Sequence, residues 1–195
     1  MKSFGGFERK LKSRGYEQLP AGAYVARIKA VKIDGQEPDQ RLVLRLDIDE
    51  GPYKEYYTKR YMHDTKNSNG KYKVNYKGDF RIRIPNEDNK NARYPEQDLK
   101  NWGDFIAKIE MSNPGYEWDW EEQGLRGKLI GVSVQQGTYN GAMYTSPKRL
   151  EVVDDVRMGR VNMMEPMAPR SDASYDPPVD QSSGFAKVET DELPF

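Results

Sequence analysis

Apolar and polar side chains alternate in short stretches along the first third of the chain. Residues 24–33 are rich in β-branched and aromatic side chains and follow a turn signal at residues 20–22, so they predict a strand. Their alternation changes phase near Ala30 and Val31, which indicates a bulge. Residues 42–48 place leucine or isoleucine at every second position, which is the pattern of a half-buried strand.

An aromatic and basic run comes next. We interpret residues 55–62 as a third strand that continues, after a polar loop at residues 64–70, around residues 80–84. In such a strand every second side chain lies on the same face. Tyr57 and Tyr61, with the lysine between them, would then share the face that meets a ligand.

A helix is predicted in the middle of the chain. Five apolar side chains fall on one stripe at helical period: Leu99, Trp102, Phe105, Ile106 and Ile109. Pro95 suits the first turn, and the Asn-Pro-Gly sequence at residues 113–115 ends the helix. Residues 128–136 and 142–153 then predict two strands around the hairpin signal at residues 140–141.

The predicted order is strand, strand, strand, helix, strand, strand. This is the order of elements in an OB-fold, a five-stranded Greek-key barrel that often binds oligonucleotides or oligosaccharides. We therefore expect a mainly β chain, with an OB-like five-stranded barrel and one helix between strands 3 and 4. The expected organisation is a flexible basic arm at residues 1–17, the barrel at residues 18–158 and a disordered acidic tail at residues 159–195.

Composition and charge narrow the class of protein. The chain has 195 residues, no cysteine and one histidine, which excludes disulfides, cysteine nucleophiles and cysteine-ligated metals. Residues 1–150 hold 27 Lys and Arg against 21 Asp and Glu, whereas residues 151–195 hold 4 against 10. From residue 162 the chain is rich in Pro, Ser and Asp, which predicts disorder. We find neither a secretory signal nor a membrane span and expect a cytoplasmic chain without membrane contact.

The candidate chemistry is concentrated between residues 53 and 83. This window holds seven aromatic side chains and nine Lys or Arg against three acids. Single-stranded nucleic acid offers phosphates to cations and base faces to aromatic rings, and each stacked base is worth about 1–3 kcal/mol. The candidate DNA-binding residues are Tyr57, Lys59, Arg60, Tyr61, Lys71, Tyr72, Lys73, Tyr76, Lys77, Arg81 and Arg83. Tyr139 and Tyr144, which flank the predicted hairpin turn, are secondary candidates.

The three tryptophans are left out of this candidate site. Trp102 lies on the apolar stripe of the predicted helix, which favours core packing. Trp118 and Trp120 alternate with acidic residues, and an acidic setting repels phosphate.

The end of the chain has a composition of its own. The last five residues place two acids before bulky apolar side chains, in the order Asp191, Glu192, Leu193, Pro194 and Phe195. Such a tip can place Phe195 in an apolar pocket while its carboxylate meets a basic rim. We therefore expect these five residues to bind a partner protein.

A basic OB-like body, a Pro/Ser/Asp-rich linker and this tip together resemble bacterial and phage single-stranded DNA-binding proteins (SSBs). The resemblance implies sequence-independent binding and protection of single-stranded DNA in replication, recombination and repair. It also implies that the acidic tip recruits replication and recombination proteins. The insertion around residues 64–78 and the segment 112–116 depart from the usual cellular SSB and look more like divergent SSB-like proteins of phages that infect Gram-positive bacteria.

Other functions stay open at this point. A structural or assembly protein could use a tyrosine-rich sheet to bind protein or sugar, and an RNA-binding OB protein leaves no distinguishing motif. Asp47, Asp49 and Glu50 cluster before a turn and could hold Mg²⁺ in a nuclease, although a strand that enters a turn also explains them. We expect no enzyme, no metal and no cofactor. The sequence leaves open whether copies form a homo-oligomer.

Overall fold

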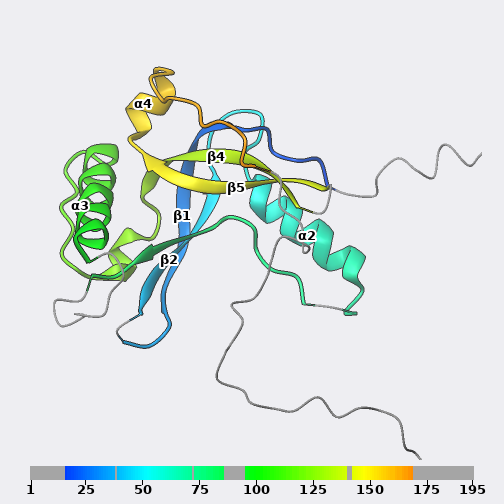
Figure 1. Ribbon diagram of the computed structural model, residues 1–195, viewed down its shortest axis with the longest axis horizontal. Helices are drawn as coiled ribbons and strands as arrows, with labels where there is room; N and C mark the ends of the chain where they lie inside the picture. The colour runs from blue at the N-terminus through cyan, green and yellow to red at the C-terminus, as the bar shows by residue number, and fades with distance from the viewer. Residues whose placement is uncertain (1–15, 38, 72, 86–94, 140–141, 169–195) are drawn as a thin grey trace, which may run out of the picture.

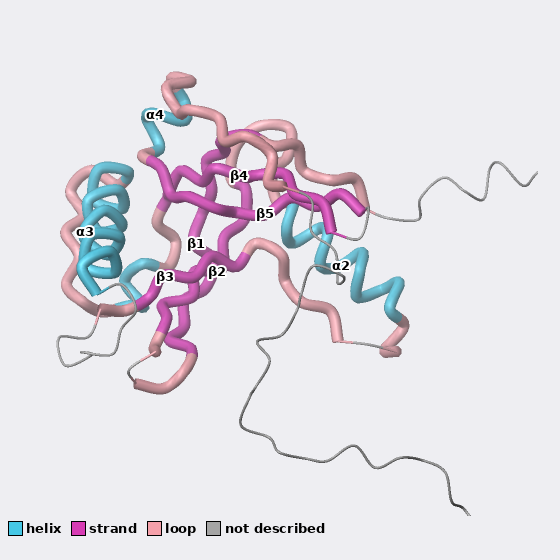
Figure 2. The backbone as a smooth tube through the Cα atoms, in the orientation of Figure 1, coloured by secondary structure: helices cyan, strands magenta, loops and turns pink. Residues whose placement is uncertain are grey.

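The computed structural model describes residues 16–37, 39–71, 73–85, 95–139 and 142–168. Its centre is a five-stranded antiparallel sheet with strand order β3-β2-β1-β4-β5. The strands are β1 (Gly22–Asp34), β2 (Arg41–Ile48), β3 (Asp79–Arg83), β4 (Leu129–Tyr139) and β5 (Ala142–Glu151). The helical elements are α2 (Tyr56–Ser68), α3 (Pro95–Ser112), the 3₁₀ helix η1 (Glu122–Leu125) and α4 (Val153–Arg157). The helices α2 and α3 lie on opposite sides of the strands (Figures 1 and 2).

The central strand β1 joins the two halves of the sheet. Its first part pairs with β4 from Gly22 to Arg27, and it pairs with β2 from Ala26 to Asp34. The register with β2 shifts between Ile28 and Ala30. The bulge predicted from the change of phase in the sequence is therefore confirmed.

The sheet is open. Its two edge strands are β3 and β5, and no hydrogen-bonded pairing joins them in the described part of the chain. The expectation of five strands with a helix between β3 and β4 is confirmed, whereas a closed barrel is not observed. The core lies on the face that carries Leu42, Leu44 and Leu46, each no more than 1% exposed.

The predicted third strand at residues 55–62 is wrong, because this run forms the helix α2. Tyr56 and Tyr57 are buried at its start. Ion pairs at i,i+4 spacing, Glu55–Lys59 and Arg60–Asp64, lie along the helix, and Asn69 ends it in the left-handed conformation. Only the continuation predicted around residues 80–84 is a strand, the short β3.

The helix predicted in the middle of the chain is confirmed as α3. Trp102, Phe105 and Ile109 are buried against the sheet, but Leu99 is 57% exposed and does not join them. The Asn113 side chain, which follows the helix, donates to the carbonyls of Ile109 and Leu129 at 2.7 and 2.8 Å, so the end of α3 is joined to β4. Among the described helices, none has the length and apolar composition that a membrane crossing requires.

Described residues on both sides of the expected domain, residues 18–158, contact it. Tyr16 was expected in the flexible arm, yet its ring centre lies 5.4 Å from that of Tyr56. At the other end, the Met167 N–H donates to the Gln136 carbonyl at 2.8 Å, so residues that were expected in the disordered tail lie along β4. The rest of the predicted arm and tail, residues 1–15 and 169–195, lie outside the described residues.

A tight contact between α2, β2 and the chain that enters β3 gives the first test of this fold. A Cβ atom added to Gly78 would lie 2.4 Å from the Leu46 carbonyl oxygen and 2.7 Å from the Tyr57 ring. Gly78→Ala should lower the free energy of unfolding, measured by urea denaturation, by about 1–3 kcal/mol.

Gly103 in the exposed part of α3 is the matched control. A Cβ atom there meets nothing within 4 Å, so Gly103→Ala should raise the free energy of unfolding by about 0.5–1 kcal/mol. Equal effects of the two substitutions would contradict the packing of Gly78.

Candidate nucleic-acid interface

A buried carboxylate on β2 holds the start of α2. Asp47 is 0% exposed, and its side chain accepts hydrogen bonds from the N–H groups of Tyr57 and Ile48 at 2.9 and 3.0 Å and from the Thr58 hydroxyl. The first N–H groups of a helix have no partner within the helix, and a carboxylate is their strongest acceptor. Asp47 therefore fixes where α2 begins and how it lies on the sheet.

The neighbouring carboxylates that suggested a metal site have protein partners of their own. Arg27 donates two hydrogen bonds to Asp49, both at 2.8 Å, and this pairing lowers the pKa of Asp49. Arg157 donates to Glu50 at 2.6 Å. In the described part of the chain, no group of three or more acidic or histidine side chains is placed to hold a metal ion.

Five tyrosines of the window, together with Tyr24, form a continuous row of ring contacts between α2 and the sheet. Successive ring centres along Tyr24, Tyr53, Tyr56, Tyr57, Tyr76 and Tyr61 lie 5.3–6.4 Å apart. Tyr57 is only 2% exposed, and burial raises the pKa of Tyr57 and raises that of Tyr24 to about 12. Tyr57 was expected to stack on bases, but its ring is part of the core.

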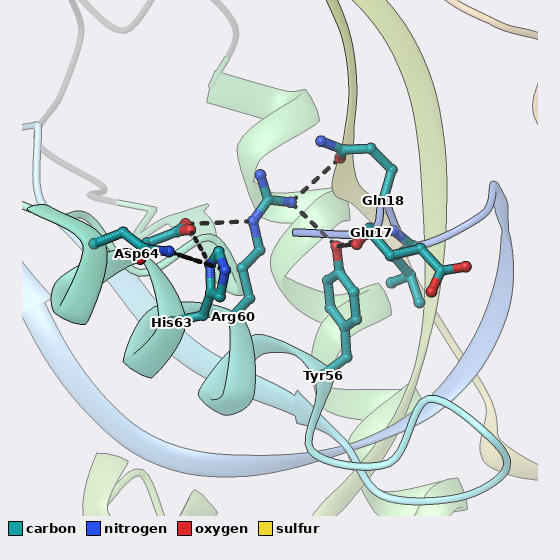
Figure 3. A network of polar contacts seen from close by, with 8 residues as sticks. Glu17, Gln18, Tyr56, Arg60, His63 and Asp64 are labelled. Carbon is teal, nitrogen blue, oxygen red and sulfur yellow. Dashed lines mark hydrogen bonds and ion pairs between the residues drawn. The ribbon is translucent and has the colours of Figure 1, made fainter. Parts of the chain in front are cut away.

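Arg60 was expected to contact DNA, but it belongs to an internal network around Tyr56 (Figure 3). The Tyr56 hydroxyl accepts the Leu19 N–H at 2.9 Å and donates to the Glu17 carbonyl at 2.8 Å. Arg60 donates to the same hydroxyl at 3.2 Å and pairs with Asp64 at 3.6 Å, with its side chain only 16% exposed. These contacts join residues 16–19 to α2.

The outer face of β2 and β3 presents cations beside two tyrosines. Arg41, Arg45 and Arg81 are exposed on the face opposite the core leucines of β2. The Arg45 guanidinium lies 4.7 Å from the centre of the Tyr76 ring, and Tyr76 lies 5.9 Å from Tyr61, which is 40% exposed. We call these five residues, Arg41, Arg45, Tyr61, Tyr76 and Arg81, the basic face.

Two cations of the basic face are available to an anion. Arg41 and Arg81 form no ion pair with any described residue, whereas Arg45 pairs with Asp79 at 3.1 Å. The Asp79 side chain is only 15% exposed and neutralises Arg45, so Arg41 and Arg81 are the main cations that this face offers to an anion. Burial raises the pKa of Tyr76, whose hydroxyl donates to the Leu46 carbonyl at 3.0 Å, and the ring stays neutral beneath Arg45.

The other predicted cations divide into two groups. Lys71, Lys73 and Lys77 are exposed on the connector between α2 and β3, without an ion pair to a described residue. Arg83 pairs with Asp39 and Asp98 at 3.3 and 3.7 Å, and Lys59 pairs with Glu55 at 3.6 Å. Tyr72 and the tip at residues 191–195 lie outside the described residues.

A cleft of about 310 Å³ lies at the open seam of the sheet, between β3, β5 and α3. It brings Arg81 and Arg83 together with Lys148 and Arg149 of β5, which the sequence did not associate with them, and Phe80 lies in its wall. Asp98 and Asp104 of α3 also line it. Of the secondary candidates, Tyr139 is 48% exposed and Tyr144 packs over Gly137.

Sequence reasoning did not include Arg41 and Arg45 among the candidate interface residues. The signal was present, because the two arginines occupy alternate outward positions of β2 on either side of Val43. The expected site was centred on the aromatic run at residues 55–62, which is helical, and it therefore did not include β2.

Comparisons with known proteins assign no family to the chain. No protein-family model matches it, and a search of the curated proteins finds no match.

The Tyr56 hydroxyl gives a direct test of the network in Figure 3. Tyr56→Phe leaves the Leu19 N–H, in a residue that is 0% exposed, without its acceptor. We expect the free energy of unfolding to fall by about 1–3 kcal/mol in urea denaturation. Tyr53→Phe is the control, since the Tyr53 hydroxyl makes no hydrogen bond to a described residue, and it should change stability by far less. If the two variants were equally stable, Tyr56 would not join residues 16–19 to α2.

Proposed function

We propose that the protein binds single-stranded DNA without reading its sequence and that it does so through the basic face. The observation that carries the proposal is the position of Arg41 and Arg81, exposed and unpaired among the described residues, beside Arg45 and the rings of Tyr76 and Tyr61. Cations in a row meet the repeating phosphate charge, and exposed rings meet base faces of any identity. The proposed function has no catalytic step.

The topology supports the same surface. A sheet of order β3-β2-β1-β4-β5 with a helix between β3 and β4 has the connectivity of an OB-fold that is open between its third and fifth strands. We propose that the domain is OB-like in this sense. OB domains bind oligonucleotides on the face of strands 2 and 3, which is where the basic face lies.

The balance between charge and stacking follows from the burial of the tyrosines. Tyr56 and Tyr57 are in the core, so of the described tyrosines in the window Tyr61 and Tyr76 are the two on the basic face. The exposed cations extend along the connector to β3. We therefore expect phosphate contacts to supply most of the affinity and binding to fall steeply with salt.

Removing the two unpaired arginines tests the electrostatic part. In fluorescence anisotropy with labelled poly-dT, Arg41→Ala with Arg81→Ala should weaken binding and flatten the log–log salt slope by about 0.7 for each phosphate that the variant no longer neutralises. The control is Lys100→Ala with Arg126→Ala, which makes the same change in net charge at exposed positions on α3 and after η1. If the control variant lost as much affinity as the arginine variant, net charge alone would explain the effect. The basic face would then be ruled out as the binding site.

Tyr61 tests the stacking part. Tyr61→Leu keeps an exposed apolar side chain but removes the ring, and it should weaken binding by about 5- to 150-fold, the equivalent of one stacked base. Tyr61→Phe keeps the ring and should bind as the unmodified chain does. The same titrations with RNA and with duplex DNA decide between the alternatives. Failure to bind any oligonucleotide would favour the structural or assembly protein, and Mg²⁺-dependent degradation would favour the nuclease.

We extend the proposal to the tail, whose tip, from Asp191 to Phe195, would recruit replication and recombination proteins. Residues 169–195 carry six acids against two cations, so they resemble nucleic acid in charge and would compete for the basic face. Truncation after residue 168 keeps the contact of Met167 with Gln136 on β4.

The truncated chain should bind poly-dT more tightly than the full chain at low salt and equally at high salt, because salt screens the competition. Anisotropy titrations of the two chains at two salt concentrations measure this difference. Unchanged affinity at low salt would rule out competition by the tail.

A further inference from the structure

A pair of tryptophans, one exposed and one partly buried, lies beside α3. Trp120 is 71% exposed, the highest value among the large apolar side chains of the described residues. Its ring stacks on Trp118, with centres 5.3 Å apart and an interplanar angle of 27°. Trp118 in turn contacts Trp102 of α3 at 5.4 Å, so the outer ring is held on a rigid support. We call Trp118 and Trp120 the indole pair.

The residues around the indole pair are acidic, and no described cation pairs with them. Glu117, Asp119, Glu121 and Glu122 flank the two tryptophans, and none of these four forms an ion pair with a described cation. Carboxylates repel a phosphate chain, so the indole pair does not extend the nucleic-acid surface. An exposed indole with carboxylates beside it attracts Lys and Arg, which gain a cation–π contact and an ion pair together.

We propose that the indole pair binds the basic arm, residues 1–15, of a second copy of this chain. The arm holds five Lys or Arg against a single Glu, and it carries two aromatic side chains, Phe4 and Phe7. Its charge complements the four acids around the indole pair, and its phenylalanines can pack on the exposed ring of Trp120. The acidic tail has the wrong charge for this site.

The position of Tyr16 relative to the indole pair suits a contact between two copies. Tyr16, the first described residue, lies against α2, with its ring centre 5.2 Å from that of His63. The indole pair contacts α3 through Trp102, and α3 and α2 lie to the left and to the right of the strands in Figure 1. An arm that leaves on one side and a receiving site on the other make a head-to-tail contact, which repeats along a row of copies instead of closing into a dimer.

This inference goes beyond the proposed function and does not rest on it. Association through the arm needs no nucleic acid, so its test uses protein alone. Variants that abolish association would leave the basic face untouched, and variants that abolish DNA binding would leave association untouched.

Paired charge reversals in the full chain provide the test. The arm variant carries Lys10→Glu and Lys12→Glu, and the patch variant carries Glu117→Lys and Glu121→Lys, whose side chains form no ion pair with a described residue. Sedimentation velocity over a concentration series at low salt should show that the unmodified chain associates. Each variant alone should associate more weakly by about tenfold or more, because the altered arm or the altered patch then has no net charge to attract the other surface.

Mixing the two variants should restore pairwise association, since the unchanged arm of the patch variant then meets the unchanged patch of the arm variant. Restoration cannot arise from a contact within one chain, because neither chain has changed. A mixture that stays as dissociated as its components, or an unmodified chain that stays monomeric throughout the series, would overturn the proposal.

Trp120→Asn tests the contribution of the indole ring while the acidic side chains around it stay in place. The backbone of residue 120 is left-handed, with φ 68°, a conformation that asparagine tolerates, so this variant keeps the local fold and loses the indole. It should associate more weakly while its circular dichroism and its free energy of unfolding in urea stay unchanged. Undiminished association of this variant would show that the indole pair is not the receiving site.

Discussion

The arrangement of this protein depends on one buried carboxylate, that of Asp47, at the start of α2. Because Asp47 takes the hydrogen bonds of Tyr57 and Thr58, the helix starts directly on β2 and turns its tyrosines into the core. The chain that follows α2 must then return beside β2, where Gly78 passes the Tyr57 ring and Tyr76 lies under Arg45. A charged group that is buried and fully paired in this way determines position more than it adds stability. The basic face is a consequence of that position.

The sequence predicts the sheet well where the apolar pattern is simple. The alternation of leucines in β2, the bulge in β1 and the stripe of Trp102, Phe105 and Ile109 in α3 each follow from periodicity alone. It fails at α2, because the buried side of that helix carries tyrosines and Arg60 instead of aliphatic residues, and aromatic residues also favour strands. The i,i+4 pair of Arg60 and Asp64 was the local sign of a helix. No pattern within residues 56–68 indicates the contact with Asp47, which lies on β2.

The same misreading of residues 55–62 as a strand also placed the expected DNA-binding surface there instead of on the neighbouring strand β2. Composition correctly indicated that cations and aromatic rings are concentrated between residues 53 and 83, but it does not say which of them the fold buries. Tyr57 and Arg60 are used inside the domain, while Arg41 and Arg45 on the neighbouring strand are outside. The basic face and the indole pair thus separate opposite charges onto two surfaces. A chain with no net charge can in this way present one surface to a polyanion and another to a basic segment.

The bulge in β1 decides which way the far end of that strand faces. Ahead of Lys29, Ala26 and Ile28 point to the core, and beyond it Val31 takes over that direction opposite Leu44. Lys29 is the extra residue of the bulge, since Ile28 and Ala30 lie opposite the adjacent residues Leu46 and Arg45. Removal of Lys29 would therefore leave a regular strand in which Val31 still faces the core opposite Leu44. In evolution the length of β1 should consequently be free to vary by one residue at this point.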